Sequence, residues 1–317
     1  MPPRRVIGLD AGGTKLLGGV VDEHLVVHHR VHRTWRGADR QETLDIMVDA
    51  VEEIRAAAPD VTAVGFGIPA LVEQATGVSR WSTHLPLQDV PFRDLMSERL
   101  GLPVEVDNDS TAALVAEHRA GAARGARHAA LIALGTGIGG GLLLDGRIYR
   151  GAHGLGAELG HMVVDLDGPD CQGACPGRGC LEVLASGTAI GVAGREAGRA
   201  APDSELGKRV AAGGEVTGPL VTELAHDGDP VAVEALAEVG RRLGAGITSV
   251  VNALNPEVVV IGGGAVAAGE LLLGPARAVV AERALPAVRE GVRIVPTHFG
   301  GESGMLGAAL LALEGVS

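Results

Sequence analysis

The three cysteines of this chain lie close together and follow a histidine, in the pattern His161-x9-Cys171-x3-Cys175-x4-Cys180. Three thiolates and one imidazole close a tetrahedral zinc site and leave no position for water, as in structural zinc centres. The pattern therefore predicts one structural Zn²⁺ that shapes the loop over residues 158–182. The alternative is that these are three unconnected thiols of a protein in a reducing compartment.

A second group of reactive residues, Asp10-Ala11-Gly12-Gly13-Thr14-Lys15, follows an apolar run. Glycines let backbone N–H groups approach phosphate oxygens, and a carboxylate beside them suits Mg²⁺ or its water shell. The segment therefore predicts a phosphate and magnesium site. The alternative is that Gly12-Gly13 is only the turn of a hairpin.

The segment Gly135-Thr136-Gly137-Ile138-Gly139-Gly140 fits the G-x-G-x-x-G spacing of dinucleotide-binding loops. A dinucleotide loop must open a helix, whereas the following residues, 141–146, predict a strand and a turn, so this interpretation fails. The chain also has no Walker sequence and no His-Arg-Asp or Asp-Phe-Gly of protein kinases. This segment is therefore predicted to be a second glycine turn between two strands.

The elements that must position these residues alternate between strands and helices. Apolar runs predict strands at 6–9, 16–21, 61–68 and 104–106, and helical spacing predicts helices over 44–54 and 92–100. The last of these strands delivers Asn108 and Asp109 at its carboxyl end, where ligands bind in open α/β sheets. Asp109 also suits a second interpretation, because an aspartate before 110–113 can cap a helix.

The second half of the chain repeats the plan of the first. An apolar run at 129–134, the glycine turn, a run at 142–144 and Asp145 follow the same order as the opening hairpin. A helix over 230–253, a strand over 258–261, three glycines and a last helix over 303–313 complete the pattern. The repeat predicts two related α/β domains that face each other across a cleft.

Composition limits the kinds of partner. The 317 residues suffice for two domains, and the net charge of −12 speaks against a nucleic-acid surface, which needs a basic face. The start of the chain is too short and too soon charged for a signal peptide, and no apolar run is long enough to span a bilayer. We expect a cytoplasmic protein that binds neither nucleic acid nor membrane.

The same motifs occur in the same order in the ROK family of sugar kinases and repressors, which the chain resembles over nearly its whole length. They are Asp10-x-Gly12-Gly13-Thr14-Lys15, Asn108-Asp109, Leu134 to Gly141, Glu158-x2-His161, Cys180-Leu181-Glu182 and Gly262-Gly263-Gly264. Within that family the chain most resembles the bacterial ATP-dependent glucokinases. The resemblance implies transfer of a phosphoryl group from ATP to a hexose, first of all to the 6-hydroxyl of glucose.

The resemblance also implies a role for each motif. Asp109 is similar to the family's catalytic base, and the sugar contacts are Asn108, Glu158, His161 and Glu182, with His161 also binding zinc through its second ring nitrogen. The phosphate loops are Asp10, Gly12, Gly13, Thr14 and Lys15 and then Gly135, Thr136 and Gly137, and the adenosine loop is Gly262, Gly263 and Gly264. As a base in a loose transition state, Asp109 is expected to need no unusual pKa.

The fold implied is an actin-like, ribonuclease-H-like pair of α/β domains. We expect a small domain of residues 1–110 plus 300–317, and a large domain of 111–299 that carries the zinc loop and a dimerisation surface. ATP, Mg²⁺ and structural Zn²⁺ are the expected cofactors. The family also implies a homodimer or a homotetramer.

Two departures from the family pattern affect the sugar site. Two extra residues separate Cys171 from Cys175, where the family usually has Cys-x-Cys, and this puts the shape of the zinc loop in doubt. Ala70 stands where these kinases commonly have glycine. Both departures therefore bear on substrate choice and not on reaction type.

Three alternative functions stay open at this point. The substrate of the kinase could be N-acetylmannosamine, N-acetylglucosamine or fructose. A catalytically silent sugar sensor is disfavoured by the intact motifs and by a phosphate loop that starts too early to leave room for a winged helix-turn-helix. A glycosidase with Glu158 and Glu182 as its carboxylate pair would leave the phosphate loops without a purpose.

Overall fold

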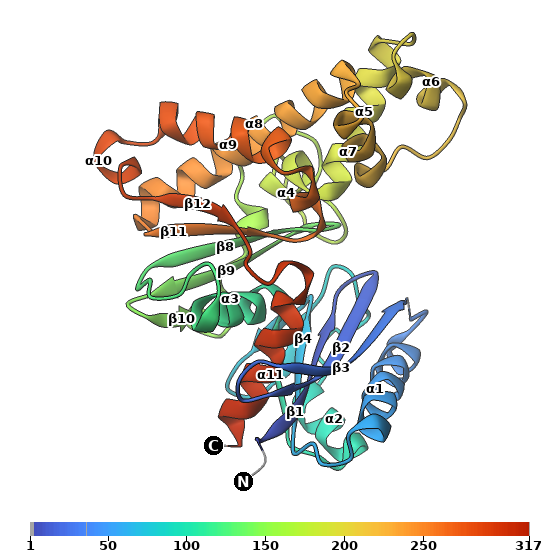
Figure 1. The fold of residues 1–317 in the computed structure, drawn as a ribbon, viewed down its shortest axis with the longest axis vertical. Helices are drawn as coiled ribbons and strands as arrows, with labels where there is room; N and C mark the ends of the chain where they lie inside the picture. Colours follow the sequence, from blue (N-terminus) through green and yellow to red (C-terminus); the bar gives the residue numbers. More distant parts are fainter. Residues whose placement is uncertain (1–2, 36, 317) are drawn as a thin grey trace. The chain divides into compact units, whose positions relative to one another are not determined.

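The computed structural model describes residues 3–35 and 37–316 (Figure 1). Contacts divide the chain into two compact units. Unit 1 comprises residues 1–127, 141–157 and 297–317, and unit 2 comprises residues 128–140 and 158–296. The division into domains of 1–110 plus 300–317 and of 111–299 stays a prediction.

The first five-stranded sheet carries the residues expected to react. Its strands are β1 (Arg5–Ala11), β2 (Lys15–Asp22), β3 (Val27–Thr34), β4 (Val64–Ile68) and β7 (Val104–Asn108), in the order β3-β2-β1-β4-β7. The strands β1, β4 and β7 are parallel, whereas β2 pairs antiparallel with both β1 and β3. The carboxyl ends of β1 and β7 therefore meet at one edge of this sheet.

The second five-stranded sheet follows the same plan. It contains β8 (Ala129–Leu134), β9 (Ile138–Leu144), β10 (Arg147–Tyr149), β11 (Val258–Gly262) and β12 (Arg293–Pro296), in the order β10-β9-β8-β11-β12. Counted within its own sheet, each strand occupies the place of its counterpart in the first sheet. The internal repeat inferred from the glycine turns is confirmed at the level of topology.

Helices cover both faces of the first sheet (Figure 1). Alternate residues of β1, such as Ile7 and Leu9, pack with α1 (Arg40–Ala57) and α2 (Phe92–Leu100) in one hydrophobic cluster. Val6 belongs to a second cluster with α11 (Ser303–Gly315) and with residues of α3 (Asp109–Ala120). The alternation that a strand imposes on its side chains thus produces a three-layer arrangement.

The helix α11 lies close against the sheet because two strands carry glycine beneath it. A Cβ on Gly8 would clash with Met305, and one on Gly65 would clash with the carbonyl of Ala308. Gly307, on the helix itself, allows the same close approach to Ala112 of α3. These contacts involve backbone atoms, so no side-chain rotation can relieve a larger residue.

We expect Gly65→Ala to destabilise the protein, because the added methyl group would push α11 away from β4. Overpacking of this kind costs about 1–3 kcal/mol. Unfolding in denaturant measures the loss. Gly301→Ala is the matched control, since a Cβ at Gly301 meets no atom within 4 Å, and its expected effect is below about 0.5 kcal/mol. Equal stability of the two variants would contradict this account of the packing.

One buried carboxylate fastens the entry to α11. Glu117 of α3 is 0% exposed. It accepts the backbone N–H groups of Ala122, His298 and Phe299 at 2.7, 3.0 and 3.1 Å, and the hydroxyl of Ser303 at 2.7 Å. Because a buried charge is tolerated only when it is hydrogen-bonded, this network fixes where α11 begins.

The helices of unit 2 are α4 (Leu181–Ala185), α5 (Gly187–Ala200), α6 (Glu205–Ala211), α7 (Gly218–His226), α8 (Pro230–Leu254), α9 (Glu270–Arg283) and α10 (Pro286–Arg289). Asp229 caps α8 by accepting from Val231 and Ala232, and Asn255 ends it in the left-handed conformation. These signals are local, so the predicted helix 230–253 is confirmed almost residue for residue. Within residues 3–35 and 37–316, no helix is long and apolar enough to cross a membrane.

Candidate active site

Asn108 and Asp109 lie where β7 passes directly into α3. Asn108 caps the helix, because its Oδ1 accepts the backbone N–H groups of Ser110 and Thr111 at 3.0 and 3.1 Å. The suggestion that Asp109 is the cap is therefore wrong. Asp109 is the first residue of the helix, and its Oδ1 accepts from the backbone N–H and the hydroxyl of Ser110 at 2.7 and 3.1 Å.

Burial raises the pKa of the Asp109 carboxyl above its ordinary value. The hydrogen bonds from Ser110 and the nearby charge of His84 act in the opposite direction but do not cancel this effect. The expectation of an unperturbed pKa for Asp109 was wrong, because burial of this carboxyl depends on residues that are distant along the chain. A carboxylate with a raised pKa is a stronger base, which suits it to accept a proton.

The raised pKa of Asp109 predicts how the rate depends on pH. The form that can accept a proton is the carboxylate, so kcat/KM should rise as the pH rises through the pKa of Asp109. We expect the midpoint of this acidic limb to lie above about 3.9, the value of a free aspartate. A pH–rate profile tests this, provided that melting temperatures measured at each pH exclude acid unfolding. A midpoint at or below the free value would contradict the assignment.

Asp10 lies near the end of β1, on the face covered by α11. Burial and the neighbouring charge of Asp109 raise the pKa of Asp10 to about 8. Gly304, in the first turn of α11, leaves room for this carboxyl, and a Cβ there would clash with it. The helix N-terminus favours a negative charge at this place. Two carboxyl groups that raise each other's energy are a donor set that fits a Mg²⁺ ion or its bound water.

Two hydrogen bonds from Trp35 hold the loop after Asp10. Trp35 Nε1 donates to the carbonyl of Gly12 at 3.0 Å, and the Trp35 backbone N–H donates to Thr14 at 3.2 Å. Neither Gly12 nor Gly13 has a positive φ, so the turn does not need glycine for its backbone angles. The glycines instead leave space beside the backbone of the turn, because they carry no side chain. The interpretation as a hairpin turn is confirmed for the backbone, since Ala11 pairs with Leu16 across β1 and β2, and the phosphate-binding role of the two glycines stays a prediction.

The second glycine turn, Gly135 to Gly137, lies between β8 and β9. Gly187 N–H donates to Gly135 O at 2.8 Å, and Thr188 Oγ1 donates to Thr136 O at 2.7 Å. The start of α5 thus holds the carbonyl side of the turn, and no helix follows it directly. This context confirms that the G-x-G-x-x-G spacing is not a dinucleotide loop.

The glycines 262–264 begin at the last residue of β11, which is the parallel neighbour of β8. Gly263 has a φ of 81°, and a Cβ there would clash with the backbone of Leu134, the last residue of β8. Only glycine satisfies both conditions. The second glycine turn and the expected adenosine loop therefore lie at the same edge of the sheet in unit 2.

The structure brings the four expected zinc ligands together. Each of these residues offers one donor atom, and the four atoms lie within 4.8 Å of one another. They are a ring nitrogen of His161 and the sulfurs of Cys171, Cys175 and Cys180. Burial and the neighbouring thiols raise the pKa of Cys171, so thiolates here need a cation. A site of three thiols and an imidazole fits zinc. The extra residues after Cys171 form a turn in which Gly173 has a φ of 60°.

His161 and Glu182 connect this cluster to other parts of unit 2. His161 faces Cys171 with Nδ1, at 3.6 Å, and Glu158 with Nε2, at 3.9 Å, so its two nitrogens can serve two sites. Glu182 is 4% exposed, and its Oε2 accepts the N–H of Ile138 at 2.8 Å. Because Ile138 follows the glycine turn, Glu182 also holds that turn in place.

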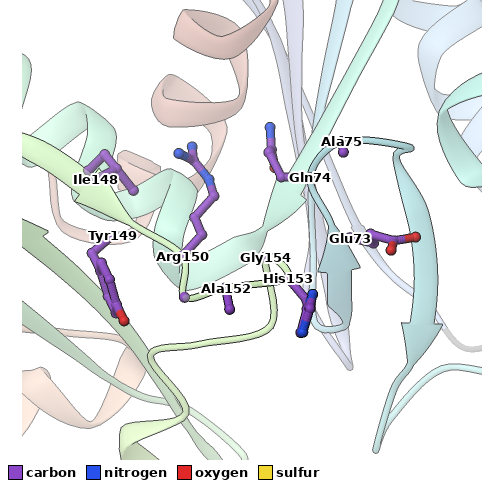
Figure 2. Close-up of a pocket in the computed structure, with 10 residues that line it drawn as sticks. Glu73, Gln74, Ala75, Ile148, Tyr149, Arg150, Ala152, His153 and Gly154 are labelled. Carbon is purple, nitrogen blue, oxygen red and sulfur yellow. The ribbon is translucent and has the colours of Figure 1, made fainter.

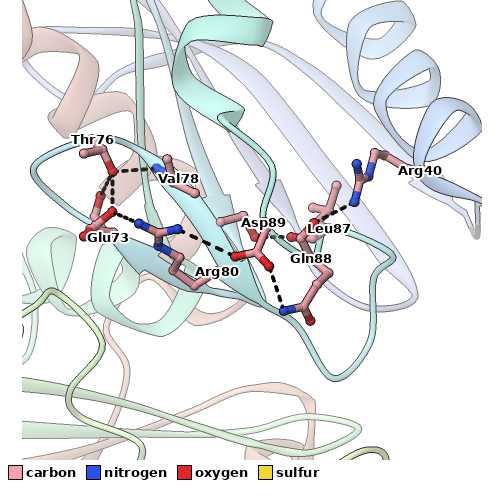
Figure 3. A network of polar contacts seen from close by, with 9 residues as sticks. Arg40, Glu73, Thr76, Val78, Arg80, Leu87, Gln88 and Asp89 are labelled. Atoms are coloured by element: carbon pink, nitrogen blue, oxygen red, sulfur yellow. Dashed lines mark hydrogen bonds and ion pairs between the residues drawn. The ribbon is translucent and has the colours of Figure 1, made fainter.

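The segment after Pro69 carries a residue that the sequence alone did not single out. His84 is exposed, yet it lies beside Gly13 and close enough to Asp109 to lower its pKa. A polar network fixes the same segment: Arg80 donates to Glu73 at 2.6 Å and lies 3.7 Å from Asp89 (Figure 3). His84 lies on a loop, so no periodic pattern in the sequence marks it.

Ala70 is accommodated without strain. Its φ is not positive, its side chain is 5% exposed, and its carbonyl lies 3.4 Å from Nδ2 of Asn108. A glycine at this place is therefore not required by the backbone.

A cavity of about 480 Å³ lies beside this region, between residues 73–75 and 148–154 (Figure 2). Tyr149 and His153 line it, together with Gln74, whose Oε1 is buried without a hydrogen-bond partner. In Figure 2 the side chain of Arg150 extends in the direction opposite to Tyr149. Its guanidinium group instead contacts Asp107, the residue before Asn108. The sequence did not single out Gln74, Tyr149 or Arg150.

Two α/β sheets of identical strand order, with carboxylates and glycine turns at the carboxyl ends of their strands, define the actin-like, ribonuclease-H-like class of proteins. The ROK family matches residues 6–315, and the chain belongs to this family. It is 33% identical to the glucokinase of Thermotoga maritima over 316 residues, 99% of each chain.

Solved structures of related proteins agree in fold. A ROK family glucokinase from Streptomyces griseus, crystallised with glucose and AMPPNP, is 32% identical, with a TM-score of 0.90 and coverage of 98% of this chain and 99% of the other. A ROK family transcriptional regulator, a homologue of the E. coli Mlc protein, is 29% identical, with a TM-score of 0.86. The alignment covers 98% of this chain and 78% of the regulator.

Proposed function

We propose that the protein is an ATP-dependent hexose kinase whose preferred substrate is glucose, phosphorylated at the 6-hydroxyl. The observation that carries the proposal is the half-buried Asp109, which has a raised pKa at the carboxyl end of β7 and lies in electrostatic contact with Asp10. The names of the similar glucokinases support ATP and glucose as the substrates.

In this proposal each residue has a defined task. Asp109 accepts the proton of the sugar hydroxyl while the new O–P bond forms and the bond to ADP breaks. Asn108, Glu158, His161 and Glu182 bind sugar hydroxyls. The loops of Gly12, Gly13, Thr14 and Lys15 and of Gly135, Thr136 and Gly137 hold phosphate oxygens, and Gly262 to Gly264 hold the adenosine.

Two metal ions belong to the proposal. Asp10 is the residue that would hold Mg²⁺ or its water, and that ion would neutralise charge on the phosphates. His161, Cys171, Cys175 and Cys180 would hold a structural Zn²⁺. A closed site of this kind takes no part in the chemistry and instead shapes the loop that carries the sugar contacts.

The second candidate function is a sugar-responsive regulator without catalysis, because a ROK transcriptional regulator matches this chain with a TM-score of 0.86. Other substrates for the kinase are N-acetylmannosamine, N-acetylglucosamine and fructose. We further propose a cytoplasmic homodimer or homotetramer, which light scattering of the purified protein tests.

A coupled assay of ADP release distinguishes these functions. Mg-ATP is offered with a panel of hexoses and N-acetylhexosamines and with no sugar, and a parallel series replaces ATP with polyphosphate. We expect the fastest release with ATP and glucose. Preference for another sugar would keep the kinase and change its substrate. No sugar-dependent release by folded, zinc-containing protein would favour the regulator.

A further inference from the structure

A buried ion pair ties the carboxyl end of β7 to the segment after β10. Asp107 is 1% exposed, and Nε and Nη2 of Arg150 lie 2.8 and 2.6 Å from its Oδ2. The other oxygen, Oδ1, accepts the backbone N–H of Asn108 at 2.9 Å. Asp107 therefore links the guanidinium of Arg150 to the backbone of the residue before Asp109.

The charge of Asp107 depends on its partner. Burial raises the pKa of this carboxyl, and the charge and hydrogen bonds of Arg150 act against that rise. Without Arg150 the buried carboxylate would be left unpaired or would take up a proton. Either change disturbs the oxygen that holds Asn108, whose own side chain caps α3.

The guanidinium of Arg150 is directed at this carboxylate. Its side chain is 23% exposed, and in Figure 2 it extends in the direction opposite to Tyr149. Along the chain, Arg150 opens the segment that leads to Glu158. One ion pair thus connects the start of that segment to β7, the strand that ends at Asn108, directly before Asp109.

We propose that Arg150 is a positioning residue, which keeps Asp107 ionised and thereby fixes the end of β7 so that Asp109 stays in the geometry needed for proton transfer. Arg150 touches no reacting atom in this account. Its effect on the rate rests on the proposed kinase function, whereas its effect on the end of β7 does not. Misplacement of a catalytic group by about 1 Å can cost on the order of a hundredfold in rate.

The test compares Arg150→Met with Arg93→Met. Arg93 is a suitable control because its Nη1 lies 4.0 Å from Glu105, a carboxylate on the same strand, and both side chains are partly exposed. For Arg150→Met we expect kcat to fall about 10- to 100-fold with KM for sugar changed less than about threefold. Arg150→Lys should be intermediate, since an ammonium replaces the charge but not the planar group.

Two further readouts separate positioning from loss of folding. Added guanidinium ion should restore part of the kcat of Arg150→Met, at concentrations that leave wild type unaffected. Hydrogen exchange of the peptide 104–113 should be faster in Arg150→Met than in Arg93→Met. If Arg150→Met does not fold, Arg150→Lys carries the same comparison.

The outcomes assign any failure to one proposal. Unchanged kcat, or a change confined to KM, together with unchanged exchange over 104–113, would overturn the positioning role while the kinase stands. If wild type phosphorylates no sugar, the proposed function fails, and the exchange experiment alone decides the inference. Faster exchange would then support Arg150 as the residue that fixes the end of β7, and equal exchange would refute it.

Discussion

Asp109→Asn should lower kcat by at least about a hundredfold, because the asparagine cannot accept the proton of the sugar hydroxyl. A hundredfold corresponds to about 2.7 kcal/mol of transition-state stabilisation. The variant should still bind sugar, since an amide keeps the size and much of the hydrogen bonding of the carboxylate. Steady-state kinetics and isothermal titration with sugar measure the two quantities.

The stability of the same variant should not fall. Burial raises the pKa of Asp109, which means that its ionised form costs folding free energy at neutral pH. The protonated form carries no such cost. The stability of the folded protein is therefore present in full at low pH, and part of it is lost as the pH rises through the pKa of Asp109 in the folded state. A neutral asparagine removes the cost, so we expect an unchanged or higher melting temperature at pH 7.

Asp94→Asn is the control for this experiment. Asp94 lies in the first turn of α2, as Asp109 does in α3, but it is exposed. We expect wild-type turnover from this variant. Near-normal turnover of Asp109→Asn would remove Asp109 as the base, and a loss of sugar binding equal to the loss of kcat would make it a binding residue instead.

The second large effect concerns zinc. Protein purified without added metal should contain one zinc ion per chain, because three thiols and an imidazole lie together around one place. His161→Ala or Cys180→Ala should lose the ion and lower the melting temperature. Binding of structural zinc contributes about 10–16 kcal/mol of folding free energy in small zinc domains. In this chain we expect the stabilisation to be confined to the loop over residues 158–182.

Limited proteolysis and metal analysis check the zinc prediction. We expect cleavage within the loop after chelation, with the rest of both units resistant. His32→Ala, which changes an exposed histidine on β3, should keep its zinc. Metal-free wild type with an intact loop and unchanged melting temperature would show that the four residues form no zinc site.

The parts of the fold found from sequence are those with local signals. The extent of α8, the helix α2, and the strand–glycine–strand units at β1 and β8 were all predicted, because each depends on a few adjacent residues. The strand β3 escaped notice, since its alternate residues, such as His28, Arg30 and His32, are polar and exposed. An edge strand with one solvated face has little apolar pattern.

The candidate site divides in the same way. Motifs of consecutive residues, such as Asn108-Asp109 and the glycine turns, were found from the sequence and from resemblance. Asp107 and Arg150 are 43 residues apart, on β7 of the first sheet and directly after β10 of the second, so only the tertiary fold brings them to 2.8 Å. A raised pKa such as that of Asp109 depends on burial by residues far along the chain, which no local pattern records.

The most direct test of the central claim is to identify the product. Folded protein is incubated with Mg-ATP and glucose, and the mixture is followed by ³¹P NMR, with Asp109→Asn alongside. The account predicts a growing phosphomonoester signal of glucose 6-phosphate that matches the loss of the ATP γ-phosphate. ATP that stays intact, or that yields only inorganic phosphate, would contradict it.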